Sequence, residues 1–174
     1  MRDPRARPDP ALGLLELYED ALPRVYGYLL SRCGDAALAE ELTAESFLAA
    51  VSAACGPGAP GPSVPWLIGV ARHKLADHWR RADREQRGLR RLDREPAVPD
   101  DPWETALDRI RAREVLGKLG PHHRAALTLR YLDGLPVPEV ARHLDRTTGA
   151  TEALLVRARA AFRRIYTAGE EGPR

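Results

Sequence analysis

A short helix, a tight turn and a longer basic helix follow one another between Leu135 and Ile165. Pro136 and Pro138 are tolerated only in the first turn of a helix, because proline lacks the N–H group that every later turn uses. The first helix must therefore begin at these residues. The apolar residues of this short helix share one face: Val137, Val140, Ala141 and Leu144. Asp145 and Arg146 then form the turn. The sequence therefore predicts a helix-turn-helix.

The second helix of this unit carries an apolar side and a basic side. Thr147 or Thr148 can cap it, because either hydroxyl can accept a hydrogen bond from a backbone N–H of the first turn. Its apolar side recurs at three- and four-residue spacing: Thr151, Leu155, Ala158, Phe162 and Ile165. Its basic residues are Arg157, Arg159, Arg163 and Arg164. A basic helix alone is usually only a solvated face, but this order of elements predicts binding to duplex DNA.

Composition favours helices over strands in the rest of the chain. Hydrophobic residues make up 44%, aromatic residues only 6% and charged residues 30%, which suits small helical bundles better than a sandwich or a barrel. We expect an all-α protein with two small helical domains, 11–85 and 104–166, joined by a flexible linker, 86–103. The linker is expected because this segment is rich in charge and proline and has no sustained apolar period.

The net charge of +2 hides an uneven distribution along the chain. Residues 10–63 contain seven acidic and two basic residues, whereas residues 66–95 contain nine basic and five acidic ones. Residues 121–166 contain eight basic and four acidic residues. This distribution suggests a protein partner for the acidic segment and nucleic acid for the two basic segments.

Two helices are predicted in the acidic segment, 11–33 and 36–54, with Gly34 and Asp35 between them. Pro23 predicts a kink in the first helix or a junction between two helices. The predicted apolar side of the second helix consists of Leu38, Leu42, Phe47, Leu48 and Val51. Its opposite side carries Glu40, Glu41 and Glu45. No His, Lys or metal-ligand pattern accompanies these carboxylates, so we expect a docking face rather than acid–base chemistry.

A basic helix from Trp66 to Arg84 is predicted to follow a Pro- and Gly-rich loop, 56–65. Its predicted buried face is Leu67, Ile68, Ala71 and Leu75. Its other residues interleave rings with positive charge: Trp66, Arg72, His73, Lys74, His78, Trp79, Arg80, Arg81 and Arg84. This combination suits single-stranded nucleic acid, because an unpaired base offers a π-face beside a phosphate. For either tryptophan taken alone, packing in a core is the simpler interpretation.

Several other classes of site have no pattern to support them. Cys33 and Cys55 lack metal-ligand spacing, so we expect a buried thiol or a loop thiol and no metal site. The chain has no Gly-rich phosphate loop and no nucleophile motif, and we expect no catalytic residue, no cofactor and no small-molecule substrate. No run of eighteen apolar residues is present, so we expect no membrane insertion and a cytoplasmic protein.

Two separated blocks, AEELTAESF at residues 39–47 and WLIGVARHKLAD at residues 66–77, carry a family resemblance. They resemble two helices of the extracytoplasmic-function branch of the bacterial sigma-70 factors. Residues 39–47, AEELTAESF, resemble the A-E-D-x-x-Q-E-x-F helix of that branch. Residues 66–77, WLIGVARHKLAD, resemble its W-L-x-x-I-A-R-N-x-x-x-D helix. Further segments look like its second conserved domain: 119–124, 131–135, 139–141 and 156–159. The order and spacing of these blocks indicate the two-domain layout of this branch.

The resemblance implies a sigma factor that binds core RNA polymerase and directs promoter-specific transcription initiation. The first domain would dock on polymerase and open the minus-ten promoter element. The implied polymerase contacts are Glu40, Glu41, Ala44, Glu45 and Leu48. The implied contacts with the unpaired minus-ten strand are Trp66, Arg72, His73, Lys74, Asp77, Trp79, Arg80, Arg81 and Arg84. The loop 56–65 would hold a flipped base.

The resemblance also implies that the second domain reads the minus-thirty-five element as duplex DNA. The implied contacts are Arg146, Thr147, Thr148, Thr151, Glu152, Arg157 and Arg159. Asp145 replaces a glycine that is usual in the turn, which Asp tolerates because it adopts the left-handed conformation more readily than most residues. Glu152 and Leu154 stand where the family commonly carries Lys or Arg. The family further implies an anti-sigma factor as a partner.

A different class of protein remains possible on the residues alone. A free-standing helix-turn-helix repressor or activator with a helical sensor domain would carry the same DNA-binding unit. Such a protein has no use for an acidic docking helix followed by a basic aromatic helix. The pairing of these two helices therefore favours the sigma factor.

Overall fold

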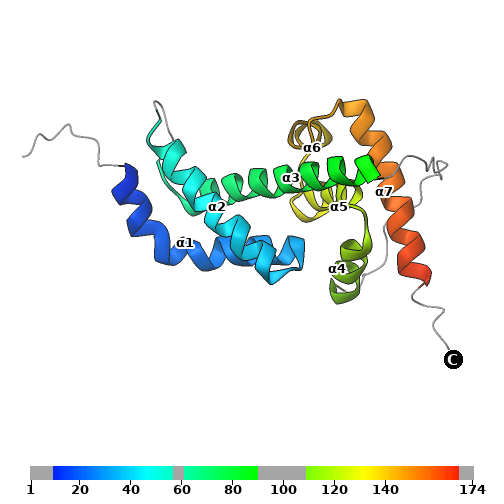
Figure 1. The fold of residues 1–174 in the computed structure, drawn as a ribbon, viewed down its shortest axis with the longest axis horizontal. Helices are drawn as coiled ribbons and strands as arrows, with labels where there is room; N and C mark the ends of the chain where they lie inside the picture. The colour runs from blue at the N-terminus through cyan, green and yellow to red at the C-terminus, as the bar shows by residue number, and fades with distance from the viewer. Residues whose placement is uncertain (1–9, 57–60, 90–108, 169–174) are drawn as a thin grey trace, which may run out of the picture. The chain divides into compact units, whose positions relative to one another are not determined.

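The computed structural model of the chain describes residues 10–56, 61–89 and 109–168. Every regular element within these ranges is a helix, and none of them is a strand (Figure 1). The predicted all-α class is therefore confirmed. Most of the predicted linker 86–103 and part of the predicted loop 56–65 lie outside the described residues.

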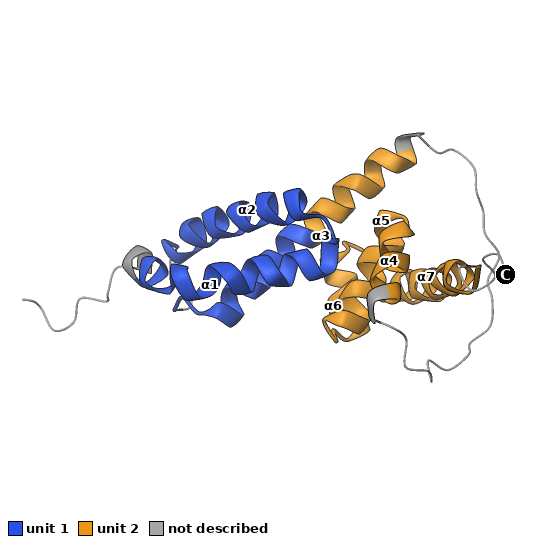
Figure 2. Ribbon diagram, turned by 90° about the horizontal axis from the view of Figure 1, so that it is seen from below, with its two compact units in different colours: residues 1–75 blue, residues 76–174 orange. Residues whose placement is uncertain are grey.

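The chain divides into two compact units, residues 1–75 and 76–174, which Figure 2 shows in blue and orange. The division lies inside the long helix α3, Val64–Leu89. The first half of α3 belongs to unit 1 and carries three buried residues, Leu67, Ala71 and Leu75. Their spacing of four residues places them on one face of the helix.

Unit 1 also contains α1, Pro10–Cys33, and α2, Ala36–Ala54, which pack against each other (Figure 1). Helix α1 runs through the exposed Pro23 without interruption, so of the two predicted alternatives at this residue, a kink or a junction, the junction is excluded. Gly34 ends α1 with a φ of 67°, a conformation that costs glycine little. Asp35 then caps α2, because its side chain accepts a hydrogen bond from the backbone N–H of Leu38 at 3.1 Å.

The buried face of α2 differs from the predicted one. Leu42 is buried as expected, but the other buried residues are small: Ala39, Thr43, Ser46, Ala50 and Ala54. The Thr43 hydroxyl donates to the carbonyl of Ala39, and the Ser46 hydroxyl donates to that of Leu42, each at 2.6 Å. These bonds within the helix satisfy both hydroxyls, so the two side chains can be buried without losing a hydrogen bond.

Unit 2 contains the end of α3 and five further elements. These are α4, Arg109–Lys118; α5, Pro121–Leu127; η1, Thr128–Leu132; α6, Val137–His143; and α7, Thr148–Ala168. Helix α7 packs against α4, α5 and α6. The π-helical turn η1 continues α5, and the N–H of Asp133 donates to the carbonyl of Thr128 at 3.0 Å. Gly134, with a φ of 67°, ends it.

Candidate nucleic-acid interface

The start of α7 is built around a capping threonine. The Thr147 hydroxyl oxygen accepts a hydrogen bond from the backbone N–H of Ala150 at 3.2 Å. The Thr147 carbonyl oxygen accepts two more, from the N–H of Thr151 at 3.0 Å and from its hydroxyl at 2.9 Å. Of the two threonines that the sequence left open, Thr147 is the cap. The preceding Asp145 has a φ of 53°, as expected for its place in the turn.

The first turns of α7 are open to solvent except at one position. Residues 147–150, 152 and 153 are exposed, whereas Thr151 is fully buried. Thr151 therefore supports the turn from inside and does not reach the surface, although the resemblance implied a DNA contact for it. Glu152 and Arg157 are both exposed. This exposed helix start carries positive backbone N–H groups that can meet an anionic or polar ligand.

Leu154 lies on the inner side of α7. Its side chain is only 1% exposed, and Leu155, Ala158, Ala161 and Phe162 are buried with it. Four of the five residues predicted for the apolar side are buried, while Ile165 is half-buried. Leu154 thus belongs to the core of unit 2. Because this position is buried, the surface loses no positive charge by having Leu here instead of Lys or Arg.

Two predicted DNA contacts of unit 2 have polar neighbours within the unit. The guanidinium of Arg159 donates to the hydroxyl of Tyr131 at 3.4 Å. The guanidinium nitrogen Nη2 of Arg146 lies 3.5 Å from a carboxylate oxygen of Asp83. Both arginines are only partly exposed. Arg157 is the predicted arginine of this group that is exposed to solvent.

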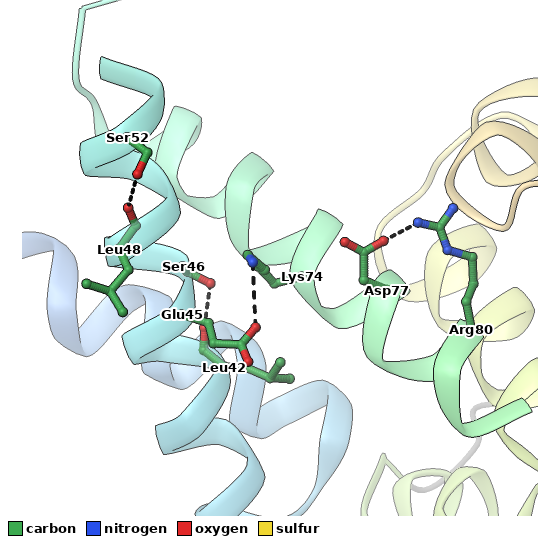
Figure 3. Close-up of polar contacts among 8 residues, drawn as sticks. All are labelled: Leu42, Glu45, Ser46, Leu48, Ser52, Lys74, Asp77 and Arg80. Carbon is green, nitrogen blue, oxygen red and sulfur yellow. Dashed lines mark hydrogen bonds and ion pairs between the residues drawn. The ribbon is translucent and has the colours of Figure 1, made fainter. Parts of the chain in front are cut away.

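The predicted single-strand contacts on α3 differ in their accessibility. His73, Arg81 and Arg84 are exposed. Trp66, Arg72, Lys74, Asp77 and Arg80 are half-buried, and Asp77 forms an ion pair with Arg80 one turn later on the same helix (Figure 3). Trp79 is only 4% exposed, so its ring is covered in this structure. Of the two tryptophans, only Trp66 lies partly at the surface.

Three of the predicted docking residues on α2 lie with Val51 on an exposed stripe of the helix. Glu41, Ala44, Leu48 and Val51 are all exposed and follow one another at spacings of three and four residues, which places them on one face. Leu48 is 70% exposed and Val51 is 45% exposed. Glu40 is exposed beside this stripe. We call Glu41, Ala44, Leu48 and Val51 the α2 stripe.

Glu45 is the exception among the docking residues. One of its carboxylate oxygens lies 3.6 Å from Nζ of Lys74, and Figure 3 shows the two side chains facing each other from α2 and α3. Leu48 points to the other side of α2 in the same view. The ion pair therefore joins a residue implied in polymerase docking to a residue implied in DNA binding.

Three exposed residues, Val51, Tyr131 and Leu132, were not predicted to lie at the surface. Val51 belonged to the predicted apolar side of α2, and its exposure could not be found from apolar periodicity alone. Tyr131 and Leu132, each 44% exposed, lie on the π-helical turn η1. The π-helical turn that carries them adds a residue to the turn and so changes the direction of the side chains.

The described residues contain neither a metal-binding cluster nor a helix that could span a membrane. None of their His, Cys, Asp and Glu side chains gather in groups of three or more that could hold a metal. None of the described helices has both the length and the apolar character that a membrane span requires. Cys33 is buried and Cys55 is exposed at the end of α2.

Comparison with known proteins identifies both parts of the chain. The family model for Sigma-70 region 2 matches residues 17–85, and the model for Sigma-70 region 4 matches residues 109–162. The chain is 32% identical over 159 residues to the ECF RNA polymerase sigma factor BldN of Streptomyces coelicolor, a match that covers 88% of this chain and 60% of that relative. It is 31% identical over 147 residues to the ECF RNA polymerase sigma factor SigL of Mycobacterium tuberculosis, which covers 80% of each chain.

The fold is also that of a solved sigma factor. The structure of RpoE from Bartonella quintana, determined in complex with the anti-sigma factor NepR, aligns with a TM-score of 0.52 and 19% identity. The alignment covers 88% of this chain and 95% of that one. The matches to regions 2 and 4, together with the similarity to BldN and SigL, show that the chain belongs to the extracytoplasmic-function branch of the sigma-70 family of sigma factors.

Proposed function

We propose that this sigma factor binds core RNA polymerase through α2 and directs it to promoters by contacting two DNA elements. The observation that carries the proposal is the exposed start of α7, where six of the seven residues 147–153 face solvent behind the Thr147 cap. A helix start presented in this way suits the major groove of duplex DNA, since side chains can reach base edges while backbone N–H groups meet phosphate.

The contacts with the minus-thirty-five element would come from the exposed start of α7 and from arginines near it. Thr148 and Glu152 lie at the exposed helix start and are proposed to reach base edges, with Thr147 beside them. Arg157 is exposed two turns later and is proposed to contact phosphate, as are Arg146 and Arg159. Thr151 supports the surface from below through its hydrogen bond to the Thr147 carbonyl.

The minus-ten element would be held as a single strand by α3. The exposed His73, Arg81 and Arg84, with the half-buried Arg72 and Lys74, supply the basic groups for its phosphates. Trp66 is the tryptophan proposed to stack on a base, because Trp79 is covered. Asp77 and Arg80 neutralise each other within α3 and are proposed to shape this surface together.

The α2 stripe is the proposed docking face for core polymerase. An exposed leucine and valine beside Glu40 and Glu41 combine apolar area with negative charge, which suits a partner surface that is both apolar and basic. The same stripe is a surface that an anti-sigma factor can cover to keep the protein inactive. Polymerase, not this chain, would carry out RNA synthesis, and the protein would act in the cytoplasm, where polymerase and promoter DNA are located.

The test is run-off transcription with purified core polymerase and a pool of promoter fragments, with and without the protein. Specific start sites that depend on the protein would establish the function and reveal both promoter elements. If core polymerase neither binds the protein nor initiates with it, while the protein alone shifts duplex DNA, the free-standing repressor or activator is the correct function.

A further inference from the structure

One ion pair connects the two proposed surfaces of unit 1. The Nζ atom of Lys74 on α3 lies 3.6 Å from a carboxylate oxygen of Glu45 on α2 (Figure 3). The side chains are 29% and 34% exposed, so both remain within reach of solvent and of a larger ligand. Glu45 follows Ala44 of the α2 stripe, and Lys74 follows the exposed His73 on the DNA side.

The direction of the Glu45 side chain separates it from its neighbours on α2. Glu41 and Leu48 are exposed, whereas Glu45 is half-buried and faces α3 (Figure 3). The other ion pair drawn on α3, Asp77 with Arg80, takes both partners from one helix and links no second surface. Glu45 is thus placed to act on the DNA side of the unit, although it belongs to the docking helix.

We propose that Glu45 is a positioning residue that acts on promoter DNA through Lys74, an inference that rests on the proposed function. When no DNA is bound, the Glu45 carboxylate pairs with the Lys74 ammonium. When DNA binds, a phosphate of the unpaired strand replaces the carboxylate as the partner of Lys74. A partly exposed ion pair is weak, and a lysine stem is flexible, so a polyanion can displace the carboxylate. Glu45 therefore competes with DNA for Lys74 and lowers the affinity of the complex.

The competition has a signature in the dependence on salt. When a lysine pairs with a phosphate of a single strand, the DNA releases condensed cations, at about 0.7 per contact. In the wild-type protein the same step also leaves the Glu45 carboxylate without its cation, and that carboxylate attracts one from solution. The two effects oppose each other. With Glu45 neutralised, the release from DNA is uncompensated and the salt dependence becomes steeper.

The experiment uses holoenzyme reconstituted with core polymerase and a promoter fragment whose minus-ten region is single-stranded. Its affinity is measured over a series of KCl concentrations for Glu45→Gln, Lys74→Met and the double variant. Glu19→Gln is the matched control, because Glu19 is an exposed residue of α1 and the substitution removes the same charge from unit 1. Affinity for core polymerase is titrated for each protein, and circular dichroism verifies that each is folded.

Glu45→Gln is expected to tighten binding to this fragment about two- to fivefold at low salt, in keeping with the strength of a partly exposed pair. The slope of log K against log salt should become steeper by up to about 0.7. Affinity for core polymerase should change less than twofold. In the Lys74→Met background, Glu45→Gln should alter neither affinity nor slope beyond the change seen with Glu19→Gln.

Two results would overturn the inference while leaving the proposed function intact. The first is an unchanged slope together with weaker binding to core polymerase, which would make Glu45 a direct docking contact. The second is an effect of Glu45→Gln that is equally large with Lys74→Met, which would show that Glu45 acts without Lys74. If the wild-type holoenzyme binds no promoter fragment at all, the proposed function itself fails and this inference falls with it.

Discussion

The Thr147 hydroxyl oxygen lies 3.2 Å from the backbone nitrogen of Ala150 and accepts its hydrogen bond at the start of α7. Loss of such a cap leaves a backbone donor of the first turn without its partner. We expect Thr147→Ala to lower the free energy of unfolding by about 1 kcal/mol. Urea denaturation followed by circular dichroism measures the change.

Thr148→Ala provides the matched control for this cap. Thr148 is an exposed neighbour of the same residue type and is the first residue of α7. The substitution should change the free energy of unfolding by less than about 0.5 kcal/mol, as is usual for exposed positions. A larger loss at Thr148 than at Thr147 would mean that the cap has been assigned to the wrong threonine.

Leu154 should matter for stability and not for base recognition. Because its side chain is 1% exposed, we expect Leu154→Ala to lower the free energy of unfolding by about 2–5 kcal/mol. Leu154→Lys, which would introduce the basic type common in the family, should unfold unit 2 rather than strengthen DNA binding, since it buries a charge. Thermal denaturation of the full chain gives the measurement. A stable Leu154→Lys protein with increased DNA affinity would disprove this placement.

The α2 stripe predicts a defect in polymerase binding without a defect in folding. Leu48 is 70% exposed, so Leu48→Ser removes little buried area from the protein itself. If this leucine packs against core polymerase, its loss should weaken the complex by about 1–2 kcal/mol, or roughly five- to thirtyfold. Titration of labelled protein with core polymerase measures the affinity.

The control for the docking prediction is Leu15→Ser on α1. Leu15 is 71% exposed, as Leu48 is, but it lies outside the α2 stripe. Affinity for core polymerase should stay within about twofold of the wild type. Equal losses for both variants would point to a nonspecific effect of removing exposed apolar area.

Local signals in the sequence predict the helices well. Residues 36–54 form α2 as predicted, Thr147 caps α7, and Asp145 takes the left-handed conformation in the turn. Each of these features depends on neighbours only a few positions away in the chain. Proline, glycine and capping residues act at this range, which makes them readable without a structure.

The direction of a helix face is harder to predict because it depends on packing. Leu48 and Val51 are apolar yet exposed, whereas Thr43 and Ser46 are polar yet buried. Small side chains allow helices to approach closely, and the hydroxyls of Thr43 and Ser46 are satisfied by carbonyls of their own helix. A scale of hydrophobicity contains neither effect, and so it places the exposed Leu48 and Val51 on the buried side of α2.

The two tryptophans of α3 illustrate the same limit at the candidate site. Trp79 is followed directly by Arg80 and Arg81, whereas no basic residue lies within five positions of Trp66, yet Trp79 is covered and Trp66 is partly exposed. Their separation of thirteen positions does not determine which elements pack over each ring. Charge patterns located the basic helix, while the accessible rings and the Glu45–Lys74 pair emerged only from the tertiary structure.

Arg157 should strengthen DNA binding without contributing to sequence preference. It is an exposed arginine two turns into α7, where a phosphate contact carries little base information. Arg157→Ala is expected to weaken binding of holoenzyme by about 1 kcal/mol or less across different promoters, with a salt slope shallower by about 0.9. Binding isotherms on several promoters at several salt concentrations measure both quantities. A changed base preference would contradict a phosphate contact.

Glu152 should weaken DNA binding and contribute to sequence preference, because it combines repulsion of phosphate with the proposed base contact. Its carboxylate is exposed near the start of α7 and can accept a hydrogen bond from a cytosine amino group. In Glu152→Gln the repulsion is removed, and the amide suits adenine better than cytosine. We therefore expect tighter binding to unrelated duplexes. We also expect the preferred base at one upstream position to change from cytosine towards adenine, with a difference in binding free energy between the two bases of about 1–3 kcal/mol. Selection of binding sites by holoenzyme from a randomised upstream element tests this. An unaltered preference at every upstream position would exclude a base contact by Glu152 and leave it only the role of weakening nonspecific binding.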